Sequence, residues 1–159
     1  MKEIPFQYQV FDNASSLSPE DASLLLQARS ITSHAYAPYS HFKVGAIALL
    51  NDGNRVEGTN QENASYPVGI CAERVLLSAI ASLYRNAAIK TIAISYHNEN
   101  GKSNNPVSPC GICRQSLLEQ TIRQQQRIRL ILSGQEGPIY VIEDAATLLP
   151  LSFTANDMQ

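Results

Sequence analysis

Apolar residues recur at intervals of three and four in several stretches of the chain, the spacing of one face of a helix. The first such helix follows Ser18, a suitable N-cap with a proline after it, and is expected to end near Ala37-Pro38. Further helices are predicted over Cys71–Tyr84 and Ile112–Arg123, with a short one over Ala145–Leu149. Leu151–Gln159 is expected to be a tail.

Runs of apolar and β-branched residues between these helices predict five strands. Phe42–Leu50 and Arg55–Gly58 flank a turn of sequence Asn-Asp-Gly-Asn and form a predicted hairpin. Three further strands are predicted over Thr91–Tyr96, Ile128–Leu132 and Pro138–Ile142. Only residues 133–137 join the last two, too few for a parallel crossover, so these two strands are expected to be antiparallel. The order of elements predicts an α/β fold with a mixed five-stranded sheet.

No repeat, low-complexity tract or linker divides the 159 residues, so residues 1–159 are expected to form a single domain. Residues 1–17 are the least patterned and are expected to be a loosely ordered N-terminal extension. No stretch approaches 18 uninterrupted apolar residues, and the first ten residues lack the features of a secretion signal. We therefore expect a soluble, cytoplasmic protein with no membrane partner.

Composition excludes two further classes of protein. A hydrophobic content of 44% with 16% charged residues argues against disorder. The net charge of −2 provides no basic surface for a polyanion, so no nucleic-acid partner is expected.

Three cysteines lie at the starts of two predicted helices. Cys71 begins one of them, while Cys110 and Cys113, three residues apart, begin the other. A thiol must lose its proton to bind a metal, and the free N–H groups of a helix N-terminus favour that negative charge. Thiolates select zinc, and three protein ligands leave the fourth tetrahedral position open for water, as in catalytic sites.

A carboxylate, Glu73, follows Cys71 by two residues. This spacing places it beside the metal without making it a ligand, where a proton shuttle is needed. The zinc-dependent base deaminases share such a pattern: a His or Cys, one residue, a Glu, and later P-C-x-x-C. Here the pattern is Cys71-Ala72-Glu73 followed by PCGIC at 109–113. Each half of the pattern alone is a weak signal for a zinc-dependent base deaminase, but the two halves together are specific for this class.

With these motifs the chain resembles the small homotetrameric zinc-dependent cytidine deaminases. The resemblance extends from about Tyr36 to Phe153, through AYAPYSHFKVGA, NQENASYP, CAER, SPCGICRQ and LLPLSF. It implies a three-layer fold with helices on both faces of the sheet, a bound Zn²⁺ ion and a homotetramer. It also implies hydrolytic deamination of cytidine and 2′-deoxycytidine to uridine and 2′-deoxyuridine, with release of ammonia, in pyrimidine salvage.

The same resemblance implies roles for individual residues. Cys71, Cys110 and Cys113 would bind zinc, and Glu73 would move a proton from the activated water to the ring nitrogen and then to the leaving ammonia. The implied substrate-binding residues are Phe42 against the base, Asn60 and Glu62 at the ribose, Ala72, and Tyr66 and Phe153, which would reach a neighbouring subunit's pocket.

A charge count suggests a role for Arg74 as well. Three thiolates and one Zn²⁺ ion sum to −1, which weakens the ability of the metal to acidify water. A guanidinium that donates hydrogen bonds to the sulfurs would offset this charge, and the resemblance points to Arg74 for that role.

Other interpretations stay open from the sequence. The cysteines alone would fit buried thiols or a structural zinc site, although none of the three histidines, His34, His41 and His97, has the spacing of a ligand.

A deaminase of a nucleoside antibiotic would share the cysteine motifs, but Asn60 and Glu62 favour a substrate that contains ribose. The acidic charge opposes a nucleic-acid-editing enzyme, as does the short 133–137 link, because nucleotide and polynucleotide deaminases resemble a form with a helix inserted there. A non-catalytic zinc protein would leave Glu73 without a purpose.

Overall fold

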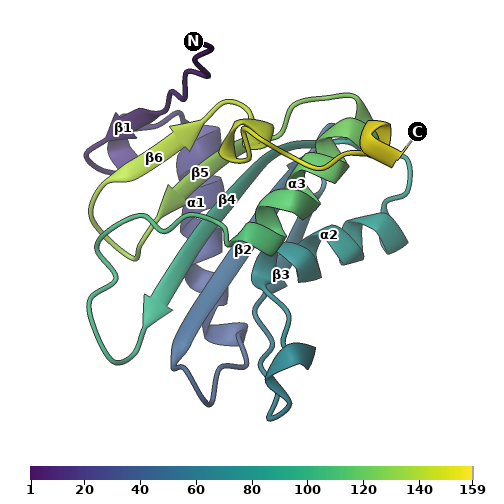
Figure 1. The fold of residues 1–159 in the computed structure, drawn as a ribbon. Coiled ribbons are helices and arrows are strands. Elements are labelled where there is room, and N and C mark those ends of the chain that lie inside the picture. The colour runs from purple at the N-terminus through teal and green to yellow at the C-terminus, as the bar shows by residue number, and fades with distance from the viewer. Residues whose placement is uncertain (159) are drawn as a thin grey trace.

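A six-stranded mixed sheet forms the centre of residues 1–158, the part of the chain that the computed structural model describes (Figure 1). The strands are β1 (Gln9–Phe11), β2 (Phe42–Leu50), β3 (Arg55–Thr59), β4 (Ile89–Asn98), β5 (Arg129–Ser133) and β6 (Ile139–Ile142). The α-helices are α1 (Pro19–Ile31), α2 (Ala72–Leu83) and α3 (Gly111–Gln124). Single 3₁₀ turns span Ala14–Ser16, Thr32–His34, Tyr66–Val68, Ala145–Leu148 and Ala155–Met158.

The strands lie in the order β1-β6-β5-β4-β2-β3. Only the β4–β5 pair is parallel, and α3 lies in the crossover between these two strands. Strands β5 and β6 are antiparallel, with Leu132 opposite Tyr140, as the short link between them predicted. None of the helices in residues 1–158 is long and apolar enough to span a membrane.

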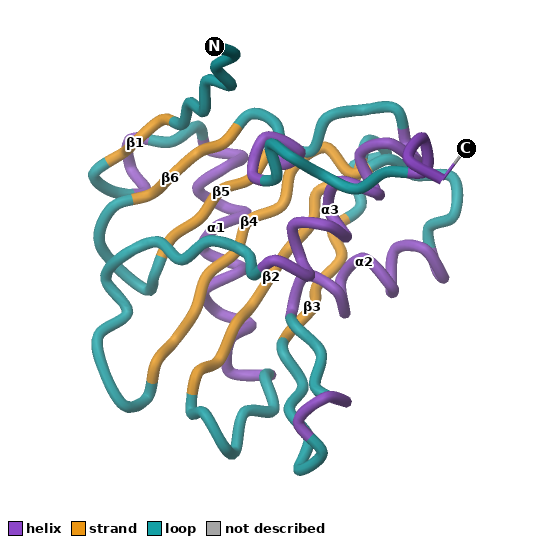
Figure 2. Tube along the Cα trace, viewed as in Figure 1, coloured by secondary structure: helices purple, strands orange, loops and turns teal. Residues whose placement is uncertain are grey.

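Helices cover both faces of the sheet and complete three layers (Figures 1 and 2). Helix α1 packs on one face through Leu24, Leu25 and Ala28. Helices α2 and α3 pack on the other face, where Leu76 and Leu117 are fully buried. The α/β class and the three-layer arrangement are therefore confirmed.

The sheet has six strands, so the prediction of five was wrong. The additional strand is β1, which pairs with β6 through Gln9 opposite Val141 and Phe11 opposite Ile139. Part of the N-terminal segment, expected to be loosely ordered, thus belongs to the sheet. The physical reason is burial, because Phe11 packs against the core beneath α1.

Helix α1 begins as predicted and ends earlier than predicted. Ser18 caps it by accepting a hydrogen bond from the backbone N–H of Asp21 at 3.2 Å. The helix ends at Ile31, not near Ala37-Pro38, and a 3₁₀ turn follows. The hydroxyl of Thr32 donates a hydrogen bond to the carbonyl of Arg29 at 2.7 Å, a local bond of the kind that competes with helix continuation.

Helix α2 lies unusually close to β3 because Gly58 has no side chain. A Cβ atom at Gly58 would lie 2.5 Å from the carbonyl oxygen of Ala72 and 2.6 Å from the backbone nitrogen of Leu76. Contacts this short do not occur for real Cβ atoms. Gly58 therefore sets the distance of the first turn of α2 from the sheet.

Candidate metal centre and substrate pocket

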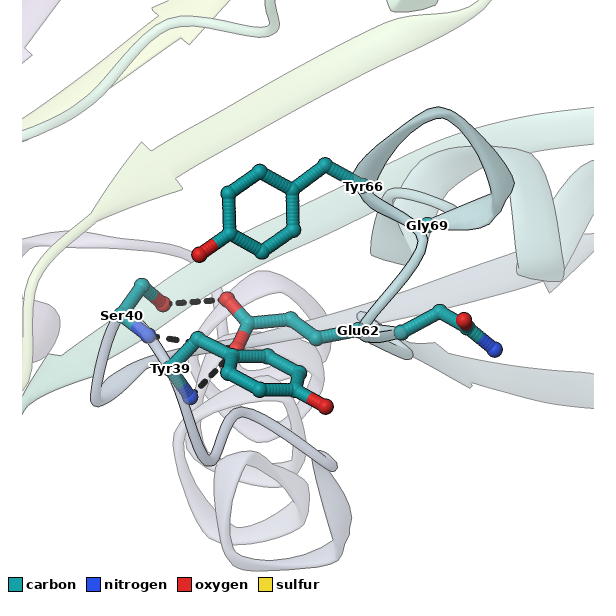
Figure 3. A pocket seen from close by; sticks show the side chains of 6 residues that line it. Tyr39, Ser40, Glu62, Tyr66 and Gly69 are labelled. Atoms are coloured by element: carbon teal, nitrogen blue, oxygen red, sulfur yellow. Dashed lines mark hydrogen bonds between the residues drawn. The ribbon is translucent and has the colours of Figure 1, made fainter.

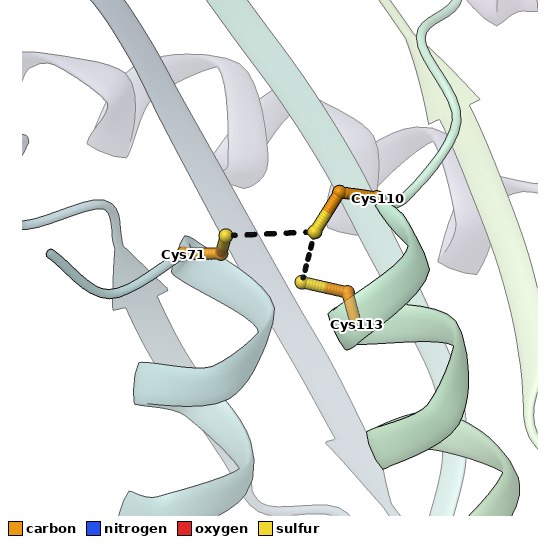
Figure 4. Close-up of side chains that lie close together, drawn as sticks. All are labelled: Cys71, Cys110 and Cys113. Atoms are coloured by element: carbon orange, nitrogen blue, oxygen red, sulfur yellow. Dashed lines mark hydrogen bonds between the residues drawn. The ribbon is translucent and has the colours of Figure 1, made fainter. Parts of the chain in front are cut away.

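Helices α2 and α3 each begin after a cysteine (Figure 4). Cys71 and Cys110 are the N-cap residues, both with extended backbone, and Cys113 lies within the first turn of α3 and is fully buried. The Sγ atom of Cys110 lies 3.8 Å from that of Cys71 and 3.5 Å from that of Cys113. All three are free thiols, and the three Sγ atoms lie within 4.8 Å of one another.

The spacing of these sulfurs fits a tetrahedral zinc ion. Zinc–sulfur bonds of about 2.3 Å at tetrahedral angles place the sulfurs about 3.8 Å apart. The two distances around Cys110 are close to that value. Within residues 1–158 the three cysteines are the only such group of potential metal-binding side chains, so the chain supplies three ligands to the site. The cysteine cluster therefore fits a Zn²⁺ ion with an open fourth position.

The cluster favours loss of a proton from Cys71. A hydrogen bond with the Cys113 thiol is the main cause and, with smaller contributions from Cys110 and the charge of Arg74, lowers the pKa of Cys71 to about 6. Burial and the carboxylate of Glu73 oppose this shift. The same hydrogen bond with Cys71 raises the pKa of Cys113. A thiolate, the form that binds zinc, is thus available at Cys71.

Glu73 lies in the first turn of α2 and is only 6% exposed. Burial raises the pKa of its carboxyl group, while its own backbone N–H and the thiol of Cys113 act in the opposite direction. The contact with Cys113 places the carboxyl group beside the cysteine cluster.

The residues on either side of Glu73 differ in exposure. Ala72 is fully buried in the core between α2 and the sheet. Arg74 is partly exposed, and its positive charge helps to lower the pKa of Cys71. Within residues 1–158 no hydrogen bond joins its guanidinium to a cysteine sulfur, so that part of the expected role stays a prediction.

Asn60, expected at the ribose, follows strand β3 and braces the start of β2. Its Oδ1 atom accepts a hydrogen bond from the backbone N–H of Val44 at 2.7 Å, and its Nδ2 atom donates one to the carbonyl of Phe42 at 2.9 Å. An amide nitrogen has two N–H groups, so one donor is left after the bond to Phe42.

Glu62 lies in the segment after Asn60 and faces the loop before β2 (Figure 3). Its Oε2 atom accepts hydrogen bonds from the backbone N–H groups of Tyr39 at 3.0 Å and Ser40 at 3.2 Å, and the Ser40 hydroxyl donates to Oε1. The Ser40 hydroxyl also accepts a bond from the backbone N–H of Phe42 at 3.1 Å. Ser40 thus links the carboxylate of Glu62 to the backbone of Phe42.

A cavity of about 370 Å³ opens beside Glu62. Its lining residues are Tyr39, Ser40, Glu62, Asn63, Tyr66 and Gly69. Tyr66 is 75% exposed and contacts Tyr39 edge to face, with ring centroids 5.8 Å apart. Phe153, also largely exposed, lies in the C-terminal segment, where its carbonyl accepts a hydrogen bond from Gln115 of α3.

The structure thus brings the predicted residues together in two groups. Cys71, Cys110 and Cys113 form the cysteine cluster, and Glu73 lies beside it. Asn60 bonds to the backbone of Phe42, and Ser40 links that backbone to Glu62. His41 and His34 face surface carboxylates, Glu99 at 3.3 Å and Glu57 at 4.0 Å.

Two residues of the site were not identified from the sequence. Ser40 binds Glu62, which is 22 residues away, so no local spacing signals the contact. Arg114 donates hydrogen bonds to the carbonyl groups of Pro109 at 2.8 Å and Leu148 at 3.2 Å, and so holds the segment before Cys110. The SPCGICRQ motif contains this arginine, and that motif was its only signal.

The fold and the cysteine cluster define an α/β protein with a zinc site. Residues 18–126 match the family described as the cytidine and deoxycytidylate deaminase zinc-binding region. A cytidine deaminase of Halalkalibacterium halodurans is 37% identical over 135 residues, which cover 85% of this chain and 95% of that protein. A cytidine deaminase of Mycoplasma genitalium is 43% identical over 97 residues, 60% of this chain and 69% of that protein.

Solved structures agree with these sequence matches. The crystal structure of a cytidine deaminase from Burkholderia pseudomallei has a TM-score of 0.71 and 37% identity, and the match covers 86% of this chain and all of that one. The crystal structure of the cytidine deaminase from Mycobacterium tuberculosis has a TM-score of 0.65 and 30% identity, and the match covers 86% of this chain and 99% of that one. The chain therefore belongs to the cytidine and deoxycytidylate deaminase family.

Proposed function

We propose that this protein deaminates cytidine and 2′-deoxycytidine hydrolytically, as part of pyrimidine salvage. The observation that carries the proposal is the position of Glu73, buried beside three cysteine sulfurs that leave one metal position open. The named relatives in the same family support cytidine as the substrate.

Cys71, Cys110 and Cys113 would hold the zinc ion, which would supply an activated water molecule by lowering its pKa. Glu73 accepts a proton as the water attacks the ring carbon that bears the amino group. It donates that proton to the neighbouring ring nitrogen, and a second proton from the water reaches the amine as the carbon–nitrogen bond breaks. Water and cytidine are thereby converted to uridine and ammonia. The burial of Glu73 keeps bulk water from competing for these protons.

The second group of residues supports a nucleoside as the substrate. The free N–H of Asn60 and the carboxylate of Glu62 are a donor and an acceptor for sugar hydroxyls. The backbone of Phe42 bonds directly to Asn60 and is linked to Glu62 through the Ser40 hydroxyl, so a base packed against its ring would be placed relative to the sugar.

The charges of the cavity favour a nucleoside over a nucleotide. No lysine or arginine lines the cavity, so a phosphate there would lack a cationic partner and would face the carboxylate of Glu62. Lys43 and His41, the basic residues nearest along the chain, both contact Glu99. The short link between β5 and β6 also favours the nucleoside enzymes, in keeping with the expectation from the sequence.

We further propose that the protein is a homotetramer of the cytoplasm, in which Tyr66 and Phe153 reach a neighbouring subunit's pocket. Both side chains are more than half exposed in the single chain, so they are accessible to a neighbouring subunit. Reduced cysteines, which the metal centre needs, are typical of the cytoplasm. Sedimentation velocity tests the assembly, and a fully active monomer would refute it.

Ammonia release from a panel of substrates tests the proposed activity. The panel contains cytidine, 2′-deoxycytidine, cytidine 5′-monophosphate and adenosine, and the zinc content of the same preparation is measured. We expect turnover of the first two compounds only. Stoichiometric zinc without turnover of either nucleoside would overturn the proposal, and turnover of the monophosphate alone would indicate a nucleotide deaminase.

A further inference from the structure

Phe42 lies against a second aromatic ring that the sequence motifs do not include. The ring of Tyr96 stacks on that of Phe42, with centroids 4.7 Å apart and planes inclined by 12°. The two residues lie on neighbouring strands, since Phe42 pairs with Asn98 and Val44 with Tyr96. Side chains alternate between the two faces of a sheet, so Phe42 shares a face with Ala46 of β2, and Tyr96 shares one with Ile94 of β4. Ala46 and Ile94 pack in the core under α2 and α3, so the two rings are diagonal neighbours on the face that carries the cysteine cluster.

The backbone contacts of Phe42 do not determine the plane of its ring. Ser40 and Asn60 hold its N–H and its carbonyl group, which fixes the position of the Cα atom. Rotation about the bonds of the side chain stays free of these contacts. The stacked ring of Tyr96 restricts this rotation, because it occupies one face of the Phe42 ring.

Tyr96 is itself firmly held. It is only 5% exposed, and its carbonyl accepts a hydrogen bond from the Nε2 atom of Gln135 at 3.2 Å. Gln135 lies in the turn between β5 and β6. This turn packs tightly on the loop that follows β4. A Cβ atom at Gly134 in this turn would lie 2.0 Å from the carbonyl oxygen of Ser103, so the two segments are in direct contact.

We propose that Tyr96 is a positioning residue that orients the ring of Phe42 for packing against the pyrimidine base. The inference rests on the proposed function, in which Phe42 contacts the base. One face of the Phe42 ring is backed by the ring of Tyr96, and Phe42 is partly exposed. A base that packs against Phe42 therefore meets a ring whose orientation is set before binding, which lowers the entropy cost of binding.

The test compares three substitutions at Tyr96 in the zinc-loaded, full-length protein. Tyr96→Leu removes the stacking surface and should raise KM for cytidine about three- to tenfold with kcat changed by less than about twofold, because base packing is present in both the ground state and the transition state. Tyr96→Phe keeps the ring and should restore the wild-type KM. Tyr96→Met, a flexible apolar side chain, repeats the test if Tyr96→Leu does not fold.

Two controls separate positioning from a general loss of stability. Tyr140→Leu, on β6, removes another tyrosine in an aromatic contact, with its ring 4.8 Å from that of Tyr8 and inclined to it by 54°, and should lower the thermal unfolding temperature without raising KM. In the Phe42→Leu background Tyr96→Leu should raise KM no further, because the two residues act through one contact.

Each result is decisive. Unchanged KM in both Tyr96→Leu and Tyr96→Met, or an equal further rise of KM in the Phe42→Leu background, would overturn the positioning role while the deaminase activity of the wild type stands. A wild-type protein with no activity on cytidine would instead overturn the proposed function and this inference with it.

Discussion

The Sγ atoms of Cys71 and Cys110, the N-cap residues of two different helices, lie 3.8 Å apart. Because both cysteines are N-cap residues, the N–H ends of α2 and α3 both lie at the cysteine cluster, and neither side chain caps its own helix with a hydrogen bond. Each helix N-terminus carries roughly half a positive charge. Two of them together offset much of the net −1 charge of three thiolates and one zinc ion, alongside the contribution expected of Arg74.

Loss of one ligand should empty this metal site. We expect Cys110→Ser to reduce bound zinc from about one ion per chain to almost none after dialysis, because the fit depends on three thiolates. Ser108→Ala, an exposed change two residues earlier, is the control and should keep its zinc. Elemental analysis of the dialysed proteins measures both, and a Cys110→Ser protein with full zinc would show that the cluster is not the metal site.

Substitution of the buried carboxylate should separate metal binding from chemistry. Glu73→Gln keeps the size of the side chain and removes its ability to accept a proton, so kcat should fall by about 10²- to 10⁴-fold while zinc content stays near one per chain. Glu119→Gln, an exposed change on α3, should leave kcat unchanged. Steady-state ammonia release gives the rates, and near-normal turnover by Glu73→Gln would remove Glu73 from the proton-shuttle role.

The close approach of α2 to the sheet should be sensitive to a single methyl group. Gly58→Ala places a Cβ atom against the backbone of Ala72 and Leu76, and we expect it to lower the free energy of unfolding by about 1–3 kcal/mol and to weaken zinc binding. Gly111→Ala is a matched control because a Cβ atom there meets nothing within 4 Å, although it lies next to Cys110. Thermal unfolding compares the two, and equal stability of both variants would contradict the explanation.

The stability contributed by Glu62 should depend on pH in a defined direction. Burial acts to raise the pKa of Glu62, but hydrogen bonds from the Ser40 hydroxyl and the backbone N–H groups of Tyr39 and Ser40 outweigh it, so the pKa lies below its ordinary value. As pH falls, the unfolded chain therefore takes up a proton at this group before the folded chain does. The stabilisation is complete above the ordinary value of 4.5 and is lost as pH falls through the folded pKa.

Denaturant unfolding at a series of pH values checks this expectation. The stability difference between wild type and Glu62→Gln should be constant from about pH 5 to pH 8 and should shrink at lower pH. Glu119→Gln is the exposed control. A difference that grows on acidification would contradict the assigned hydrogen bonds.

The sequence predicted which residues lie together where chemistry and spacing coincide. Cys71, Cys110, Cys113 and Glu73 lie in two short motifs at helix starts, so local periodicity and ligand chemistry were enough to place them. The hydrogen bonds between Ser40 and Glu62, and the stacking of Tyr96 on Phe42, join residues far apart in the chain. Such pairs follow from strand register and loop packing, which local patterns do not specify.

The errors in the fold have equally specific causes. The end of α1 was placed too late because the competing hydroxyl bond of Thr32 is not visible in the hydrophobic pattern. Strand β1 was missed although Ile4, Phe6, Tyr8 and Val10 alternate with polar or proline residues, a period of two that favours a strand. The segment is short, and its pairing with β6 is set by a contact more than 120 residues away in sequence.

Strand β1 has a consequence for the solubility of the protein. Without it, the apolar strand Ile139–Ile142 would be the edge of the sheet, with a row of unpaired backbone groups that could template association with other chains. Pairing with Gln9–Phe11 moves the edge to a strand of three residues, and very short edge strands resist such association. The pairing of the N-terminal segment with β6 therefore disfavours aggregation through the edge of the sheet opposite β3.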